Sequence, residues 1–232
     1  MPGSRSAFAR IHPREGRAAT WIRRLRHLAS ARRRRTADHR VRKALARTTD
    51  PSYTTDYVSN FGEDWTRALA PMAGRPGVRL LEIGSFEGRS AAWFLKHVLT
   101  DESSELVCVD IFSRPGLEAR FDHNIRLADR HGQVRKLKGK SADVLVTLEA
   151  ASFDAIYVDG GHDAATVLLD AVLAWRLLKP GGVLIFDDYL WQPERPLSER
   201  PQLAIDLFLE TTGDALEILH AGYQVIGRKG SR

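Results

Sequence analysis

Apolar and polar positions follow two different periods from Val78 to the C-terminus. Short apolar runs, typical of buried strands, occupy residues 78–83, 106–109, 134–137, 153–158 and 183–186. Longer stretches with apolar residues at helical spacing lie between them, over 88–99, 116–131, 142–150 and 164–178. Strands that alternate with helices are joined by right-handed crossovers, so we expect a parallel sheet with helices on both faces.

The last two apolar runs, over 216–219 and 223–226, follow a helix predicted over 202–211, and only three residues separate them. A crossover between parallel strands needs about a dozen residues, so these two strands must be antiparallel. The chain over 78–232 is therefore predicted to form one doubly wound, Rossmann-like α/β domain. Its seven-stranded sheet is mostly parallel and ends in an antiparallel C-terminal hairpin.

A further helix is predicted in residues 48–77, which precede this domain. It spans residues 52–72, and its apolar stripe has four-residue spacing. The stripe consists of Tyr57, Phe61, Trp65 and Leu69. The helix either packs on the core or forms a lid over a pocket, and the spacing fits both roles.

Charge divides the chain near residue 47. Residues 1–47 hold 15 of the 35 Lys and Arg residues but only two of the 29 Asp and Glu residues, a net charge of +13. The remaining chain has a net charge of −7. We expect residues 1–47 to be a flexible tail, because like charges repel and little apolar surface can be buried. The functional alternatives for the tail are an anionic membrane contact, a nucleic-acid contact or an organellar transit peptide.

The rest of the composition excludes several classes of protein. A single cysteine, Cys108, forbids an intramolecular disulfide and a cysteine-rich zinc site. No apolar stretch reaches the roughly 18 residues of a membrane-spanning helix, and the N-terminus has no apolar signal-peptide core. We expect a cytoplasmic protein, with organellar targeting by the basic N-terminus as the alternative.

Polar residues stand at the ends of four of the predicted strands. In doubly wound sheets, ligands bind beyond the carboxyl ends of the strands. We therefore expect these residues to gather along one rim of the sheet. They are Glu82 with Gly84, Asp110, Asp159, and Asp187 with Asp188.

The first two strand ends indicate a nucleoside ligand. Asp110 is placed to accept hydrogen bonds from ribose hydroxyls, by analogy with dinucleotide-binding folds. The turn from Gly84 to Gly88 lacks the G-x-G-x-x-G pattern that cradles a pyrophosphate. A nucleoside-bearing cofactor without a pyrophosphate reconciles both observations, and S-adenosylmethionine (SAM) meets that description.

Three longer motifs resemble class I SAM-dependent methyltransferases. They begin at Leu81, Phe153 and Lys179 and read L-E-I-G-S-F-E-G-R-S, F-D-A-I-Y-V-D-G-G-H and K-P-G-G-V-L-I-F-D-D-Y. Within that class, residues 52–229 are similar to metal-dependent O-methyltransferases. The similarity is to the macrocin O-methyltransferase-like group, which acts on sugar hydroxyls, and more distantly to catechol O-methyltransferase.

The resemblance implies a role for each motif residue. The methionine part of SAM would be surrounded by Glu82, Gly84, Ser85 and Ser90. Asp110 would hold the ribose, and Ser141 and Ala142 would flank the adenine. A divalent cation, with Mg²⁺ favoured, would be bound by Asp159, Asp187 and Asp188, and Asp159 would also lie close to the cofactor. His162 would be the general base.

Elementary electrostatics supports this metal site. A second carboxylate at ~4 Å costs about 4 kcal/mol at an effective dielectric near 20, so three clustered aspartates require a cation. An all-oxygen site suits Mg²⁺, Mn²⁺ or Ca²⁺. Neighbouring strand residues face opposite ways, so Asp187 and Asp188 converge only if the chain leaves the strand there. The alternative is that one aspartate caps a helix and another faces solvent.

These residues predict a metal-dependent O-methyltransferase that acts on a hydroxyl of a small molecule, such as a sugar or a natural product. His162 suits proton removal because histidine titrates near neutral pH. Tyr189 and Trp191 could wall the acceptor pocket. Another enzyme on the same fold, such as a hydroxylase, is one alternative. The other alternative is an RNA-modifying or nucleic-acid-binding protein that uses the basic tail. The net negative charge of the chain after residue 47 argues against this alternative. The sequence is also compatible with a homo-oligomer.

Overall fold

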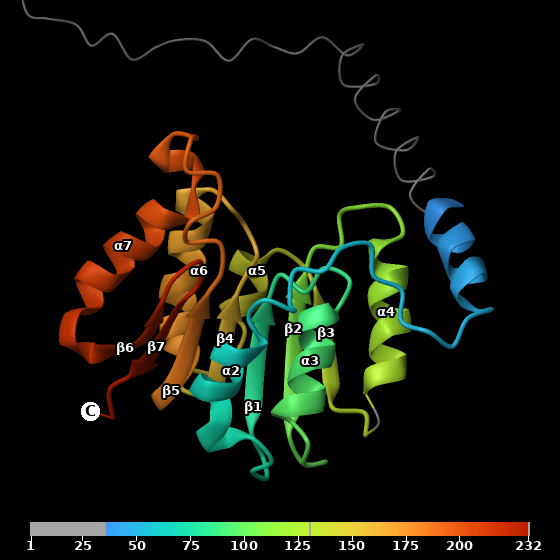
Figure 1. The fold of residues 1–232 in the computed structure, drawn as a ribbon, viewed down its shortest axis with the longest axis horizontal. Helices are drawn as coiled ribbons and strands as arrows, with labels where there is room; N and C mark the ends of the chain where they lie inside the picture. The colour runs from blue at the N-terminus through green and yellow to red at the C-terminus, as the bar shows by residue number, and fades with distance from the viewer. Residues whose placement is uncertain (1–35, 130, 232) are drawn as a thin grey trace, which may run out of the picture.

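The computed structural model describes residues 36–129 and 131–231. The predicted tail up to residue 35 lies outside this part of the chain. Seven strands form one sheet in the order β3-β2-β1-β4-β5-β7-β6, with helices on both faces (Figure 1). The strands are β1 (Arg79–Ile83), β2 (Glu105–Asp110), β3 (Val134–Lys138), β4 (Phe153–Val158), β5 (Leu178–Phe186), β6 (Leu216–Ala221) and β7 (Val225–Lys229).

The strand directions confirm the predicted fold class. Strands β1 to β5 pair in parallel, whereas β7 is antiparallel to both β5 and β6. Chain order reverses at β1, because β2 and β3 lie on one side of it and β4 and β5 on the other. Ligands of doubly wound sheets bind at such a switch point, beyond the carboxyl ends of the strands.

Apolar strand residues alternate between two cores because both faces of the sheet are covered. Leu80 and Leu106 belong to the core on one face, whereas Leu81 and Val107 belong to the core on the other. The first face is covered by α2 (Gly62–Leu69), α3 (Arg89–His97) and α4 (Leu117–Ala128). The second is covered by α5 (Ser141–Leu145), α6 (Ala164–Leu177) and α7 (Pro201–Thr212).

The helix predicted over 52–72 is wrong in its first half, because α2 begins at Gly62. Side chains bind the backbone before that point and compete with helix formation. Asp56 accepts hydrogen bonds from the backbone N–H groups of Val58 (3.1 Å) and Ser59 (3.0 Å). Tyr57 is consequently 62% exposed and not part of a buried helical stripe.

Two other predicted boundaries are also corrected. Helix α5 starts at Ser141 and spans five residues, so the predicted extension to residue 150 is wrong. Strand β5 starts at Leu178 and includes Pro180, Gly181 and Gly182, whereas the predicted strand spans residues 183–186. A register shift between β4 and β5 accommodates these three residues as an irregularity of the strand.

Residues 36–45 are helical and lie beside α4 (Figure 1). Leu45 in this helix is only 7% exposed. This described end of the predicted tail contacts the body, because Arg42 binds Asp122 of α4 and Asp38 binds the backbone of Gly116. Among the described residues, no helix is long and apolar enough to cross a membrane.

Candidate active site

The carboxyl ends of β1, β2, β4 and β5 meet at one rim of the sheet. The backbone N–H of Gly84 donates to Val109 (2.8 Å), that of Asp159 to Ile83 (2.8 Å) and that of Asp187 to Val158 (3.0 Å). The residues predicted to gather therefore do lie along one edge.

Gly84 makes the approach between the first and fourth strand ends possible. Its φ is +90°, and a Cβ on it would lie 1.9 Å from the carbonyl oxygen of Asp159. A residue with a side chain would push the loop after β1 away from Asp159. The loop over 84–88 therefore lies directly against the end of β4.

Glu82 is fully buried in β1 behind this loop. Its carboxylate accepts hydrogen bonds from Ser90 Oγ (2.5 Å) and Cys108 Sγ (3.4 Å). Burial raises the pKa of Glu82, and the hydrogen bonds partly oppose that shift. Glu82 and Ser90 are thus a bonded pair under the loop, and Ser85 is buried at its start.

Asp110 joins the first and second strand-end loops. Its Oδ2 accepts from the backbone N–H of Phe86 (2.9 Å), and its Oδ1 accepts from that of Phe112 (2.5 Å). Each carboxylate oxygen can accept a further hydrogen bond, so Asp110 keeps the capacity to bind hydroxyl groups.

Further residues lie beside Asp110 at this part of the rim. Ile111 next to Asp110 is 51% exposed. The backbone N–H of Gly139 donates to the carbonyl of Asp110 (3.0 Å), which brings the start of α5 beside the same loop. Ser141 and Ala142 are the first two residues of that helix. An acid with spare acceptor capacity and an exposed apolar side chain fit the ribose and adenine of SAM.

Asp159, His162 and Asp188 converge at the other half of the rim. One ligand atom from each lies within 4.8 Å of the other two, and His162 Nε2 is 2.7 Å from Asp188 Oδ2. Asp188 has φ +61°, two residues beyond the end of β5. The chain therefore leaves the strand at this point, as the convergence of these acids requires.

Asp187 has different partners. Its Oδ1 accepts from the backbone N–H of Asp188 (2.7 Å), and its Oδ2 accepts from the hydroxyl of Tyr157. The donor set that the structure brings together thus contains His162 in place of Asp187. Two carboxylates and an imidazole are ligands for Mn²⁺, Fe²⁺ or Zn²⁺ as well as for Mg²⁺. This donor chemistry fits a divalent cation.

Crowding of negative charge shifts the acidities of this cluster. Burial, together with the charges of Asp187 and Asp188, raises the pKa of Asp159 well above its ordinary value. Burial and the charge of Asp188 also raise the pKa of Asp187. The hydrogen bond to Asp188 raises the pKa of His162 against the effect of desolvation. A bound cation would offset the repulsion that, after burial, contributes to the pKa shifts of Asp159 and Asp187.

Two tyrosine hydroxyls that the sequence analysis did not predict also belong to the cluster. Tyr157 donates to Asp187 and lies 3.3 Å from Asp159 Oδ2, and Tyr223 donates to Asp188 Oδ1 at 2.8 Å. Tyr157 precedes Asp159 by two residues, so strand periodicity alone places both on one face and was a usable signal. No local signal marks Tyr223, which reaches the site only through the antiparallel hairpin.

The two residues predicted to wall the acceptor pocket, Trp191 and Tyr189, have different side-chain partners. The Trp191 ring lies 4.9 Å from the His162 ring, so Trp191 borders the site. Tyr189 instead donates to Asp206 on α7 at 2.8 Å. On the opposite side, Phe61 stacks on Tyr223 at 5.8 Å, while Trp65 is fully buried in the core. Helix α2 is therefore a packed helix that borders the site, and a lid role for it stays a prediction.

The fold, with its switch point at β1 and polar residues along the strand ends, is that of class I methyltransferases. Residues 81–189 match the family model described as a methyltransferase domain. The O-methyltransferase TomG of Streptomyces achromogenes, solved in complex with SAM, has the same fold. Its TM-score is 0.60 at 18% identity, over 84% of this chain and 89% of that one.

Two curated relatives match over shorter lengths. The O-methyltransferase hkm8 of Aspergillus hancockii is 28% identical over 131 residues, which are 53% of this chain and 47% of that protein. The uncharacterised protein R132 of Acanthamoeba polyphaga mimivirus is 29% identical over 135 residues, 54% of this chain and 59% of that protein. The chain thus spans about half the length of the curated relatives it matches.

Proposed function

We propose that the chain is a SAM-dependent O-methyltransferase that methylates a hydroxyl of a small molecule with the help of a divalent cation. The observation that carries this proposal is the convergence of Asp159, His162 and Asp188 on one rim with Asp110. The relatives named as O-methyltransferases support the same reaction class.

The cofactor would lie across the ends of β1, β2 and β4. Asp110 would accept hydrogen bonds from the ribose hydroxyls, with the exposed side chain of Ile111 against the adenine. Ser141 and Ala142 would flank the adenine. The loop over 84–88, with Ser85, Ser90 and Glu82, would surround the methionine part, and Asp159 would lie beside it.

Asp159 and Asp188 would hold the cation, with Asp187 or His162 as the third ligand. When bound, the cation would lower the pKa of the acceptor hydroxyl and orient it. As the general base, His162 would donate Nε2–H to Asp188, which leaves Nδ1 free to accept the hydroxyl proton. Trp191 would shield this proton transfer from water. Because the sulfonium methyl is already activated, the protein would contribute mainly positioning and desolvation.

Calorimetric titration of the full chain tests the proposal. We expect S-adenosylhomocysteine (SAH) to bind with Mg²⁺ present or chelated, because Asp110 and the loop over 84–88 lie apart from the carboxylate cluster. We expect methyl transfer from labelled SAM to a panel of hydroxylated sugars and phenols to stop in excess chelator. Failure of SAH to bind would refute the cofactor site, and full transfer in chelator would refute the metal role.

A further inference from the structure

Both loops proposed to bind SAM contain a bulky residue in the left-handed region. Phe86 in the loop over 84–88 and Phe112 in the loop over 110–116 each have φ +45°. Residues other than glycine rarely adopt this conformation, and they keep it only where the surrounding structure determines it strongly. The contacts that surround these two loops therefore determine the conformations of Phe86 and Phe112.

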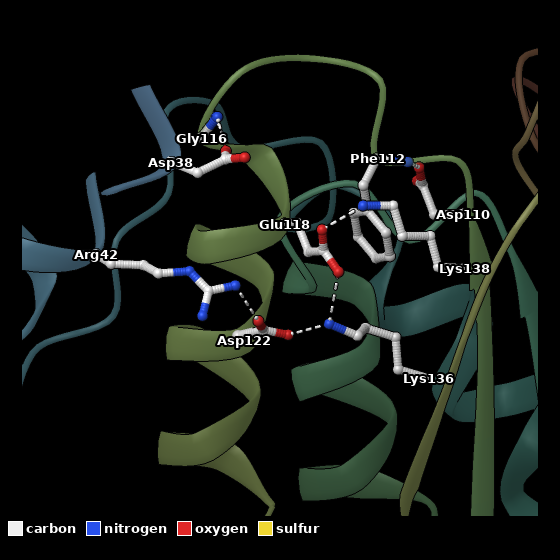
Figure 2. Close-up of polar contacts among 9 residues, drawn as sticks. All are labelled: Asp38, Arg42, Asp110, Phe112, Gly116, Glu118, Asp122, Lys136 and Lys138. Carbon is white, nitrogen blue, oxygen red and sulfur yellow. Dashed lines mark hydrogen bonds and ion pairs between the residues drawn. The ribbon is translucent and has the colours of Figure 1, made fainter. Parts of the chain in front are cut away.

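The helix over 36–45 contacts the second loop directly (Figure 2). Asp38 Oδ1 accepts a hydrogen bond at 2.7 Å from the backbone N–H of Gly116, the residue that precedes α4. Gly116 has φ +79°, and a Cβ on it would lie 2.7 Å from the side chain of Val41. The helix over 36–45 thus covers the end of the loop at close packing distance.

A chain of charges leads from this helix to Phe112 (Figure 2). Arg42 pairs with Asp122 on α4 (3.3 Å), and Asp122 pairs with Lys136 on β3 (2.5 Å). The ammonium group of Lys136 lies 5.5 Å from the centroid of the Phe112 ring. Arg42 therefore helps to fix the cation that packs on the loop residue whose N–H binds Asp110.

Residues 50–56 hold the first loop. Thr54 donates to the Glu87 carboxylate through its backbone N–H (2.6 Å) and through its hydroxyl (3.0 Å). Glu87 is only 3% exposed. Ser52 exchanges two hydrogen bonds with Asn124 of α4, at 2.7 and 3.0 Å, and Asn124 also donates to the Glu87 carbonyl at 2.8 Å. The same segment thus connects α4 with the loop over 84–88.

We propose that residues 36–59, here called the N-terminal brace, are positioning residues for cofactor binding. The brace holds the loops over 84–88 and 110–116 in the conformations that SAM requires, although no brace residue touches the cofactor. The proposal rests on the proposed function, because it takes these loops as the SAM site. It assigns part of the segment first interpreted as a basic tail to the cofactor site.

Asp38→Ala tests the brace in the full-length protein, with SAH as the probe in titration calorimetry. Loss of the acceptor for the Gly116 N–H should weaken SAH binding about fivefold. It should raise the KM for SAM by a similar factor and leave kcat at saturating SAM within about twofold. Amide hydrogen exchange over residues 110–117 should become faster. Asp38→Asn should restore wild-type values, because its amide oxygen can accept the same hydrogen bond.

Arg42→Gln and Arg40→Gln form a matched pair, because each removes one positive charge from the same helix. Arg40 is exposed and has no ion pair with any residue in the described part of the chain. Only Arg42→Gln should weaken SAH binding. Equal weakening in both variants, or wild-type affinity in Asp38→Ala and Arg42→Gln, would overturn the brace.

The two proposals fail in different ways. A wild-type protein that does not bind SAH would refute the cofactor site. Amide hydrogen exchange in the two loops would then still test whether the brace holds them. Unchanged exchange over residues 84–89 in Thr54→Val and over 110–117 in Asp38→Ala would show that the brace does not hold the loops.

Discussion

The two halves of the rim satisfy their acids in different ways. The ends of β1 and β2 are here called the cofactor half, because SAM is proposed to bind there. In this half protein donors hold the carboxylates: Asp110 accepts hydrogen bonds from two backbone N–H groups, and Glu82 accepts them from Ser90 and Cys108. At the ends of β4 and β5, the acidic half, Asp159, Asp187 and Asp188 lie against one another. There the donors to the side chains are tyrosine hydroxyls, His162 and one backbone N–H.

This difference indicates what each half still lacks. The cofactor half is preorganised, and the acceptor capacity that remains on Asp110 suits the neutral hydroxyls of a ribose. Burial, together with the unbalanced negative charge of the acidic half, raises the pKa values of Asp159 and Asp187. A cation should therefore act strongly on the acidic half and weakly on the cofactor half.

Asp188→Asn should produce the largest effect, because it removes a proposed cation ligand and the partner of His162 at once. Metal-stimulated methyl transfer should fall by about 100-fold or more. SAH affinity should change by less than about threefold, since Asp188 lies outside the cofactor half. Initial rates and calorimetry measure the two quantities.

Asp206→Asn is the matched control, because Asp206 binds Tyr189 away from the cluster. It should leave both quantities unchanged. A parallel loss of SAH affinity in Asp188→Asn would show that the two halves of the rim are not independent.

His162→Gln distinguishes a base from a metal ligand. If His162 is the base, methyl transfer should fall by about 10²- to 10⁴-fold while Mn²⁺ affinity, measured by calorimetry, stays nearly constant. A loss of Mn²⁺ affinity equal to that of Asp188→Asn would instead assign His162 as the third ligand. Asp187→Asn completes the test. If three protein ligands hold the cation, only one of Asp187 and His162 is a ligand, so only one of the two variants should lose much Mn²⁺ affinity.

Tyr157→Phe should have a smaller effect on the acidic half. Its ring packs edge-on against Trp65 and Phe94, so the phenylalanine should fill the same space and remove only the hydroxyl. Without that donor, Asp159 and Asp187 lose a hydrogen bond that orients them, and Mn²⁺ affinity should fall about tenfold. Tyr189→Phe removes a comparable hydroxyl outside the cluster. An equal Mn²⁺ affinity in both variants would contradict an orienting role for Tyr157.

Much of this arrangement could be predicted from the sequence because strand ends are marked locally. Apolar periodicity placed Asp110, Asp159 and Asp187 at strand ends, and the topology of parallel sheets then brought them to one rim. The Asp187-Asp188 pair predicted that the chain must leave the strand, and the positive φ of Asp188 confirms it.

Other features could not be predicted because they depend on contacts between distant segments. Asp38 meets Gly116 across 78 residues, and Trp65 donates to Gln224 across 159. Helical periodicity over 52–72 failed because Asp56 binds the backbone of Val58 and Ser59 and prevents a helix there. Charge patterning likewise gave no sign that residues 36–45 pack on α4.

Asp170 on α6 allows the smallest and most selective test, because it lies behind the rim and should affect stability but not chemistry. It is 1% exposed, and burial raises its pKa to about 6. The folded protein therefore holds a proton on Asp170 that the unfolded chain releases near pH 4. The contribution of Asp170 to stability should fall as the pH rises from about 4 to 6 and then level off, at a cost of at most about 3 kcal/mol. Asp170→Asn should remove this contribution, so denaturant unfolding should find the variant more stable than wild type at pH 7 but not at pH 4. Asp143→Asn on exposed α5 should show no such pH-dependent difference, and a variant destabilised equally at both pH values would mean that Asp170 is ionised and paired in the fold.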